Sequence, residues 1–451
     1  MFSFISRQIL ETTPFSAYGP RFHWLSSADI FLQELAFNTM RHFTKYEIQL
    51  LTISRLKYIT SAAAHISYWA SMFSSTDFTS EQMKDLVYFS RLPIATRKNL
   101  MNIPLEQRSD PARAKYFKTP IIVTSGSTGH PLHFYSSPIR QVRIRGYYRH
   151  IISELGRSFM LFETTTPTVF NLGMWNHRGL YPWQGFSFGK DMENALYRKV
   201  LFDKWGNNPA NFLYTSAAYL KRLFFWSKQD GFIPSFRAII FTAQGLEHGE
   251  RDELTRYFCC PLISFYGTHE TTLMGVECLF QIGRFHLVPE MNHTEIVDEL
   301  GKVLSIGKWG RVISTPFDNE ISPFIRYDVA DRGKIEENPN CPCGRKTDFL
   351  VIEGRTTDYI LLSHERQIVV REITVVLDKL LLGKAYQFQL DQRDRNKLKI
   401  RIVPTSQFTT QDQTHIISKV TELLGGALPV SLEMVPSIPV ESNGKIRLFL
   451  K

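Results

Sequence analysis

The chain has 451 residues, which is too long for one ordinary hydrophobic core and predicts two or three domains. With 43% hydrophobic and 21% charged residues, the composition is that of a globular protein. The sequence contains no run of 18 or more apolar residues, so no membrane span is predicted. The net charge of +10 favours anionic partners such as nucleotides, but no Lys/Arg-rich block predicts nucleic-acid binding. The first residues lack the charged-then-apolar order of a secretory signal, so we expect a cytoplasmic protein.

The first 80 residues are predicted to be helical. Apolar side chains recur at near-3.6 spacing in Ile30–Phe37 and again in Ser61–Trp69. Farther on, Thr96 is placed to cap a short helix after a proline-containing turn. We interpret this region as core helices and a lid over the main fold.

A loop of small hydroxyl residues and glycines, Thr124-Ser-Gly-Ser-Thr-Gly-His-Pro131, lies between two apolar β-type runs, residues 120–123 and 132–135. Glycine accepts positive φ angles and hydroxyl groups add donors, so such a loop can direct its N–H groups at a phosphate chain. This loop differs from the P-loop of the large NTPase class, because it lacks the Gly-Lys-Ser/Thr sequence at its end. A plain hairpin loop is the alternative interpretation.

Strands and helices then alternate, which predicts a parallel α/β sheet covered on both faces. The expected strands are residues 160–163, 211–214, 236–241 and 262–266, and the expected helices are residues 138–156, 217–229 and 249–258. Residues 165–190 are interpreted as a Gly- and aromatic-rich loop, which lines an apolar ligand pocket or packs on the surface. Ligands bind beyond the carboxyl ends of such strands, where residues 242–246 and 267–272 lie.

The chain changes character after residue 275. Short strands are expected in a β-rich subdomain over residues 275–353, at 285–287, 294–298, 302–306, 310–314 and 324–327. A small α+β domain follows, with helices at 370–381 and 410–424 and strands at 359–362, 386–390, 397–403 and 432–435.

Three cysteines and one histidine can form a structural zinc site. Cys278 and His286 are eight residues apart, and Cys341 and Cys343 follow in a Pro-Gly turn. Three thiolates and one imidazole complete a closed tetrahedral ligand set, whose role is to pin the β-rich subdomain and not to catalyse. Buried unpaired cysteines beside a surface histidine are the alternative.

Five segments in a fixed order resemble the adenylate-forming superfamily of acyl-CoA synthetases, luciferases and adenylation domains. They are Thr124-Ser-Gly-Ser-Thr-Gly129, Tyr266-Gly-Thr-His-Glu270, Arg326-Tyr-Asp-Val-Ala-Asp331, Gly354-Arg-Thr-Thr-Asp358 and Asn443-Gly-Lys445. The Leu-Pro-Ile-Ala-Thr-Arg segment ending at Arg97 and the Cys-x-Cys-Gly-Arg segment are similar to the phenylacetate–CoA ligase and capsule-biosynthesis adenylyltransferase-like branch. The resemblance covers about residues 85–451.

The resemblance implies an α/β fold with two domains. A large N-terminal domain, residues 1–355, would hold doubly covered, mostly parallel sheets and the β-rich subdomain. A small mobile α+β domain, residues 356–451, would carry the catalytic lysine.

The resemblance also implies a reaction that uses ATP and Mg²⁺. A carboxylic acid, aromatic or otherwise apolar, would attack the α-phosphate of ATP to give an acyl-adenylate and pyrophosphate. The acyl group would then pass to a thiol of CoA or of an acidic carrier protein, or to an amine.

The family's functional residues carry over onto matching positions. Catalytic roles fall to Glu270, as the Mg²⁺ ligand, and to Lys445, which would bridge the substrate carboxylate and the α-phosphate. Tyr266 would stack on adenine, and Asp331 with Arg355 would bind the ribose. The remaining nucleotide-binding candidates are Ser125, Gly126, Ser127, Thr128, Gly129, Gln244, Gly245 and Gly267.

Three positions depart from the family pattern. His269 stands where Thr or Ser is usual, and Thr357 stands at the hinge in place of Asp or Lys. Glu365 lies where family CoA ligases carry a glycine beside the pantetheine, so it can narrow a thiol tunnel. These departures leave open an alternative, a non-catalytic nucleotide-binding interaction protein that retains the fold.

Overall fold

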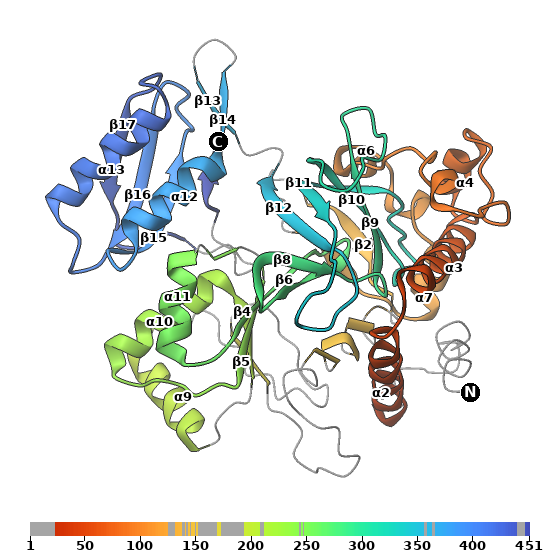
Figure 1. Ribbon diagram of the computed structural model, residues 1–451, viewed down its shortest axis with the longest axis horizontal. Coiled ribbons are helices and arrows are strands. Elements are labelled where there is room, and N and C mark those ends of the chain that lie inside the picture. Colours follow the sequence, from red (N-terminus) through yellow and green to blue (C-terminus); the bar gives the residue numbers. More distant parts are fainter. Residues whose placement is uncertain are drawn as a thin grey trace. The chain divides into compact units, whose positions relative to one another are not determined.

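The computed structural model describes residues 23–124, 131–137, 140, 143, 144, 146–148, 150, 151, 169–172, 194–207, 212–242, 245, 246, 248–355, 359–362, 366–439 and 447–451 (Figure 1). The chain divides into two compact units, residues 1–163 with 265–353 and residues 164–264 with 354–451. We call these the first and the second unit. Among the described residues, no helix combines the length and apolarity that a bilayer crossing requires.

Helices form the N-terminal part of the first unit, as predicted. They are α2 (His23–Met40), α3 (Lys45–Ala63), α4 (Ser67–Ser74), α5 (Leu86–Phe89), α6 (Arg97–Met101), a 3-10 turn (Leu105–Gln107) and α7 (Pro111–Tyr116). Side-chain caps fix the starts of α3 and α6: Thr44 forms a capping box with Glu47, and the predicted cap Thr96 accepts from the N–H of Asn99.

The prediction of one continuous helix across residues 61–69 was wrong. Helix α3 ends at Ala63 and α4 begins at Ser67, because Ile66 adopts an extended conformation and turns its side chain into the core. That core contains Trp69 and Phe89 from the helices together with Phe317 and Phe324 from the loop that precedes strand β11.

An antiparallel sheet forms the rest of the first unit. Its strands are β7 (Thr272–Cys278), β8 (Gln281–Leu287), β12 (Phe349–Arg355), β11 (Tyr327–Glu336), β10 (Gly310–Pro316) and β9 (Asn292–Val297), in that spatial order after the end of β6 (Leu262–Thr268). Strands β1 (Ile121–Val123) and β2 (His133–Tyr135) pair separately as an antiparallel hairpin around the glycine loop.

Two of the predicted short strands are absent or shifted in this sheet. Residues 302–306 form only one bridge, between Val303 and Val297, because Gly301 and Gly307 turn the chain at φ +85° on either side. Strand β11 begins at Tyr327, later than expected, since Arg326 also has a positive φ of 46°.

The second unit contains a parallel sheet, as predicted, although the expected strand at residues 160–163 lies outside the described residues. Its strands run in the order β3 (Val169–Leu172), β4 (Phe212–Ser216), β5 (Ala238–Thr242) and the start of β6, all parallel. The helices are α9 (Ala195–Asn207), α10 (Ala217–Asp230) and α11 (His248–Phe258). The loop interpretation of residues 165–190 was wrong at β3, whose backbone pairs with β4; of that stretch, the structure describes only β3.

Residues 359–451 form the small α+β fold that the sequence predicts. A hairpin of β13 (Tyr359–Leu361) and β14 (Gln367–Val369) precedes a sheet ordered β17 (Val430–Met434), β16 (Leu398–Pro404), β15 (Ala385–Asp391) and β18 (Phe449–Leu450), with helices α12 (Val370–Leu381) and α13 (Thr410–Leu423). The α/β fold class is therefore confirmed, while the domain boundary at residues 355/356 and the mobility of the small domain stay predictions.

Candidate active site

The turn between β6 and β7 is held by two threonine side chains. The hydroxyls of Thr268 and Thr271 lie 3.0 Å apart, and Thr268 Oγ1 accepts from the N–H groups of Glu270 and Thr271 at 3.2 and 3.1 Å. Gly267 enters the turn so closely that a Cβ there would lie 1.7 Å from the Thr272 carbonyl oxygen. Only glycine fits at position 267, so the predicted Tyr-Gly pair has a steric cause.

The carboxylate of Glu270 is buried and anchored through one oxygen. Oε1 accepts from Arg97 Nη1 at 3.0 Å and from the Tyr327 hydroxyl at 3.3 Å. Burial, and then the charge of Glu270, raise the pKa of Tyr327 well above its ordinary value, so the phenol stays protonated and donates. Both of these bonds are made by Oε1, and within the described part of the chain Oε2 accepts none.

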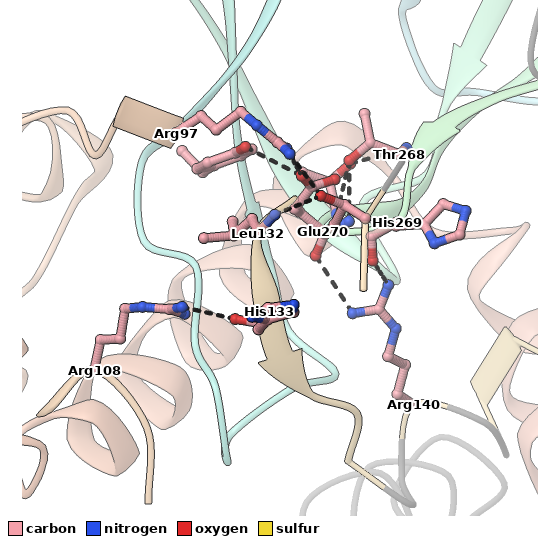
Figure 2. A network of polar contacts seen from close by, with 11 residues as sticks. Arg97, Arg108, Leu132, His133, Arg140, Thr268, His269 and Glu270 are labelled. Carbon is pink, nitrogen blue, oxygen red and sulfur yellow. Dashed lines mark hydrogen bonds and ion pairs between the residues drawn. The ribbon is translucent and has the colours of Figure 1, made fainter. Parts of the chain in front are cut away.

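Arg97 contacts the Glu270 carboxylate, as Figure 2 shows, and also reaches Thr124, the first residue of the glycine loop segment. Its Nη2 donates to Thr124 Oγ1 at 2.7 Å, and the same hydroxyl accepts from the N–H of Leu132 at 3.0 Å. A second bond, from Thr124 N–H to the Leu132 carbonyl, also measures 3.0 Å. The two ends of the loop are therefore clamped together beside Glu270. The loop residues Ser125, Gly126, Ser127, Thr128 and Gly129 lie outside the described residues.

Backbone pairing places Arg97 in this position. Ala95 forms a parallel bridge with Tyr327, through bonds of 3.0 Å from its N–H to the Arg326 carbonyl and 2.9 Å from the Asp328 N–H to its own carbonyl. Helix α6 starts two residues later, so Arg97 and Tyr327 reach Glu270 together.

Two other predicted nucleotide-binding residues also lie together. The hydroxyl of Tyr266 donates to Asp331 Oδ2 at 2.6 Å, and its ring lies 5.8 Å from that of Phe285. Gly245 belongs to the second unit, as does the backbone of Arg355 at the end of β12. Gln244, Lys445 and the side chain of Arg355 lie outside the described residues.

Sequence reasoning did not assign roles to Arg97 and Tyr327. Arg97 lies 173 residues before Glu270, and nothing in its local pattern identifies that partner. Both residues lie in segments that resemble the family, next to Thr96 and Arg326. This position in the sequence could have identified them as site residues.

The four predicted metal ligands come together on the first unit. The ligand atoms of Cys278, His286, Cys341 and Cys343 all lie within 4.8 Å of one another. Cys341 Sγ is 3.3 Å from Cys278 Sγ and 3.2 Å from Cys343 Sγ, which is 3.1 Å from His286 Nε2. His286 Nδ1 lies 3.1 Å from the Thr347 carbonyl, so it donates there and leaves Nε2 for a metal. A Cys₃His set of this kind fits zinc.

A family model matches the C-terminal part of the chain. Residues 361–451 match the family described as the CapK C-terminal domain. No curated protein sequence matches the chain.

Similar solved structures cover most of the chain. A 2-hydroxyisobutyryl-CoA ligase in the postadenylation state, in complex with R3-HIB-AMP, has 16% identity, covers 91% of each chain and has a TM-score of 0.72. The same ligase in the thioesterification state, with 2-HIB-AMP and CoA, has 17% identity, coverage of 91% and 92%, and a TM-score of 0.60. An anthranilate–CoA ligase with anthranoyl-AMP has 15% identity, covers 72% of this chain and 64% of its own, and has a TM-score of 0.52. The chain therefore has the fold of these ligases, and its residues 361–451 match the CapK C-terminal domain.

Proposed function

We propose that this protein is an AMP-forming acid ligase that activates a carboxylic acid with ATP. The observation that carries the proposal is Glu270, which is anchored through one oxygen beside the clamped ends of a glycine loop. The fold supports it, because the similar solved structures are ligases with bound acyl-AMP species.

Glu270 fits a magnesium site. Mg²⁺ prefers carboxylate oxygen, and Oε2 of Glu270 is the available atom. A bound Mg²⁺ would supply neutralisation of phosphate charge. Arg97 and Tyr327 would hold the carboxylate in one orientation while the glycine loop, residues 125–129, binds the β- and γ-phosphates.

The proposed reaction consists of an adenylyl transfer followed by an acyl transfer. A carboxylate oxygen of the acid attacks the α-phosphorus of ATP, and the bond to pyrophosphate breaks with its electron pair leaving on pyrophosphate. In the second step a thiol or an amine attacks the acyl carbon and gives up its proton to solvent, and the acyl C–O bond breaks with its electron pair leaving on AMP. We propose that Tyr266 and Asp331 bind adenosine with Arg355, Gln244, Gly245 and Gly267, and that Lys445 bridges the carboxylate and the α-phosphate.

The nature of the acid and of the acceptor is inferred from the aromatic residues, from the similar ligase and from the net charge. The aromatic content of residues 165–190 favours an aromatic or apolar acid. CoA is one acceptor, since CoA is bound in the similar 2-hydroxyisobutyryl-CoA ligase, while the net charge of +10 also suits an acidic carrier protein.

ATP–pyrophosphate exchange without CoA tests this function. We expect exchange that depends on one class of acid in a panel of aryl and aliphatic acids. Measurable ATP binding with no exchange for any acid would contradict the ligase proposal and favour a non-catalytic nucleotide-binding protein. Once the acid is known, CoA and carrier-protein thiols can be compared directly.

We also propose that Cys278, His286, Cys341 and Cys343 bind a structural zinc ion. Cys343→Ser is expected to reduce bound zinc from about one per chain to a small fraction and to lower the melting temperature, since structural zinc contributes folding energy. Metal analysis and thermal denaturation of the purified protein measure both effects. Cys259→Ser is the control, because Cys259 is exposed and lies outside the cluster. Wild-type protein without zinc would contradict the site.

A further inference from the structure

A buried arginine holds the Glu270 turn on the side opposite to Arg97. Arg140 follows the glycine loop and is 5% exposed. Its Nη1 donates to the Glu270 carbonyl at 3.4 Å, and its Nη2 donates to the carbonyl of His269 (Figure 2). The guanidinium therefore contacts the backbone of the turn and not the carboxylate.

Together with the bonds from Thr268, these hydrogen bonds fix the backbone on both sides of Glu270. The N–H groups of Glu270 and Thr271 are both held by Thr268 Oγ1, and the carbonyls of the same two peptide units are both held by Arg140. Each peptide plane next to the Glu270 Cα is thus bonded on both edges. The direction of the Cα–Cβ bond follows, and with it the point from which the carboxylate extends.

The surroundings keep the guanidinium in place. It lies over the ring of Phe134, with 5.2 Å from Cζ to the ring centroid. Burial lowers the pKa of Arg140, but the nearby carboxylates of Asp318 and Glu270 counter this effect. Asp318 is itself fully buried; burial raises its own pKa, while the positive charge of Arg140 lowers it.

We propose that Arg140 is a positioning residue that sets the affinity of Glu270 for a divalent cation in the nucleotide complex. The inference rests on the proposed function, because it assumes that Glu270 binds the metal. Arg140 acts through the backbone, so its loss should weaken metal binding more than nucleotide binding. Lysine keeps the charge but lacks the planar fork that reaches two carbonyls.

The test measures Mn²⁺ binding to the full-length protein, a measurement that does not require catalytic turnover. Free Mn²⁺ is counted by electron paramagnetic resonance in the presence of α,β-methylene ATP. We expect Arg140→Lys to weaken Mn²⁺ binding by about tenfold, the equivalent of one charge-assisted hydrogen bond. Affinity for the nucleotide without metal should remain close to that of the wild type.

Arg108→Lys is the matched control. Arg108 is 6% exposed and also donates to carbonyls, from Nε to Ile103 at 3.1 Å and from Nη2 to His133 at 2.7 Å. It supports strand β2 rather than the Glu270 turn (Figure 2). We expect this variant to lose thermal stability to a similar extent and to bind Mn²⁺ like the wild type.

Three results would overturn the inference. They are wild-type Mn²⁺ affinity in Arg140→Lys, an equal loss in Arg108→Lys, and no nucleotide-dependent Mn²⁺ binding in the wild-type protein. Failure of the ligase proposal gives a different result, since wild-type protein would then bind Mn²⁺ with the nucleotide and catalyse no pyrophosphate exchange.

Discussion

Replacing Glu270 with glutamine is expected to lower the maximal rate of ATP–pyrophosphate exchange by about 10²–10³-fold, the effect typical of one preorganised charge-stabilising group. The amide keeps the shape of the side chain but removes its negative charge, so Oε2 no longer attracts a cation. The fold should remain intact. The amide oxygen of glutamine can still accept from Arg97 Nη1 and from the Tyr327 hydroxyl, so the contacts that hold this side chain in place persist.

Glu277→Gln provides the control for this experiment. Glu277 lies on β7 and is also 6% exposed, and its Oε1 accepts from the Gly283 N–H at 3.0 Å in the β7–β8 pair. We expect its exchange rate to stay close to that of the wild type. A Glu270→Gln variant with full exchange activity would show that the carboxylate is not required for adenylation.

Replacing Arg326 with alanine is expected to lower the free energy of unfolding by about 3–5 kcal/mol, because it strips a buried carboxylate of its partner. Arg326 Nε lies 3.0 Å from Glu295 Oε2, and the two side chains are 2% and 4% exposed. Nη1 also donates to the carbonyls of Ser90 and Leu92. Alanine would leave an unpaired charge and these acceptors inside the first unit, and urea denaturation measures the loss.

Arg332→Ala tests whether burial is the cause. The ion pair of Arg332 with Glu353 measures 2.7 Å, but its side chains are 47% and 39% exposed. Solvent screens such pairs, so we expect a change of about 1 kcal/mol or less. Equal losses of unfolding free energy in Arg326→Ala and Arg332→Ala would show that burial does not determine the effect.

The fold was predictable wherever the local pattern matched the burial. Helix α12 occupies residues 370–381 as expected, because Val370, Ile373, Leu377 and Leu381 form one buried face. The run at residues 302–306 is equally apolar, yet two flanking glycine turns keep it out of the sheet. An apolar run alone does not distinguish a paired strand from an exposed turn.

The site was predictable only in its short motifs. Motif order proposed Glu270, Tyr266 and Asp331 as separate nucleotide-site candidates, and their roles stay predictions. The four metal-ligand candidates, proposed from the Cys278–His286 spacing and the Cys-Pro-Cys-Gly turn, do lie together. The anchors Arg97, Tyr327 and Arg140 were missed as site residues. Their partners are set by strand pairing and by a turn 57 to 173 residues away, which no local periodicity encodes.

The discontinuity of the first unit has a consequence for biosynthesis. Arg97 and Thr124 precede residues 164–264, which belong to the second unit, whereas Glu270 and Tyr327 follow them. A growing chain therefore exposes the glycine loop and its arginine well before their acidic partner leaves the ribosome, and closing so long a segment carries an entropic cost. Nascent chains that end before Tyr327 should not bind ATP. Capture of nascent chains of increasing length on immobilised nucleotide would therefore show at which chain length the first unit folds.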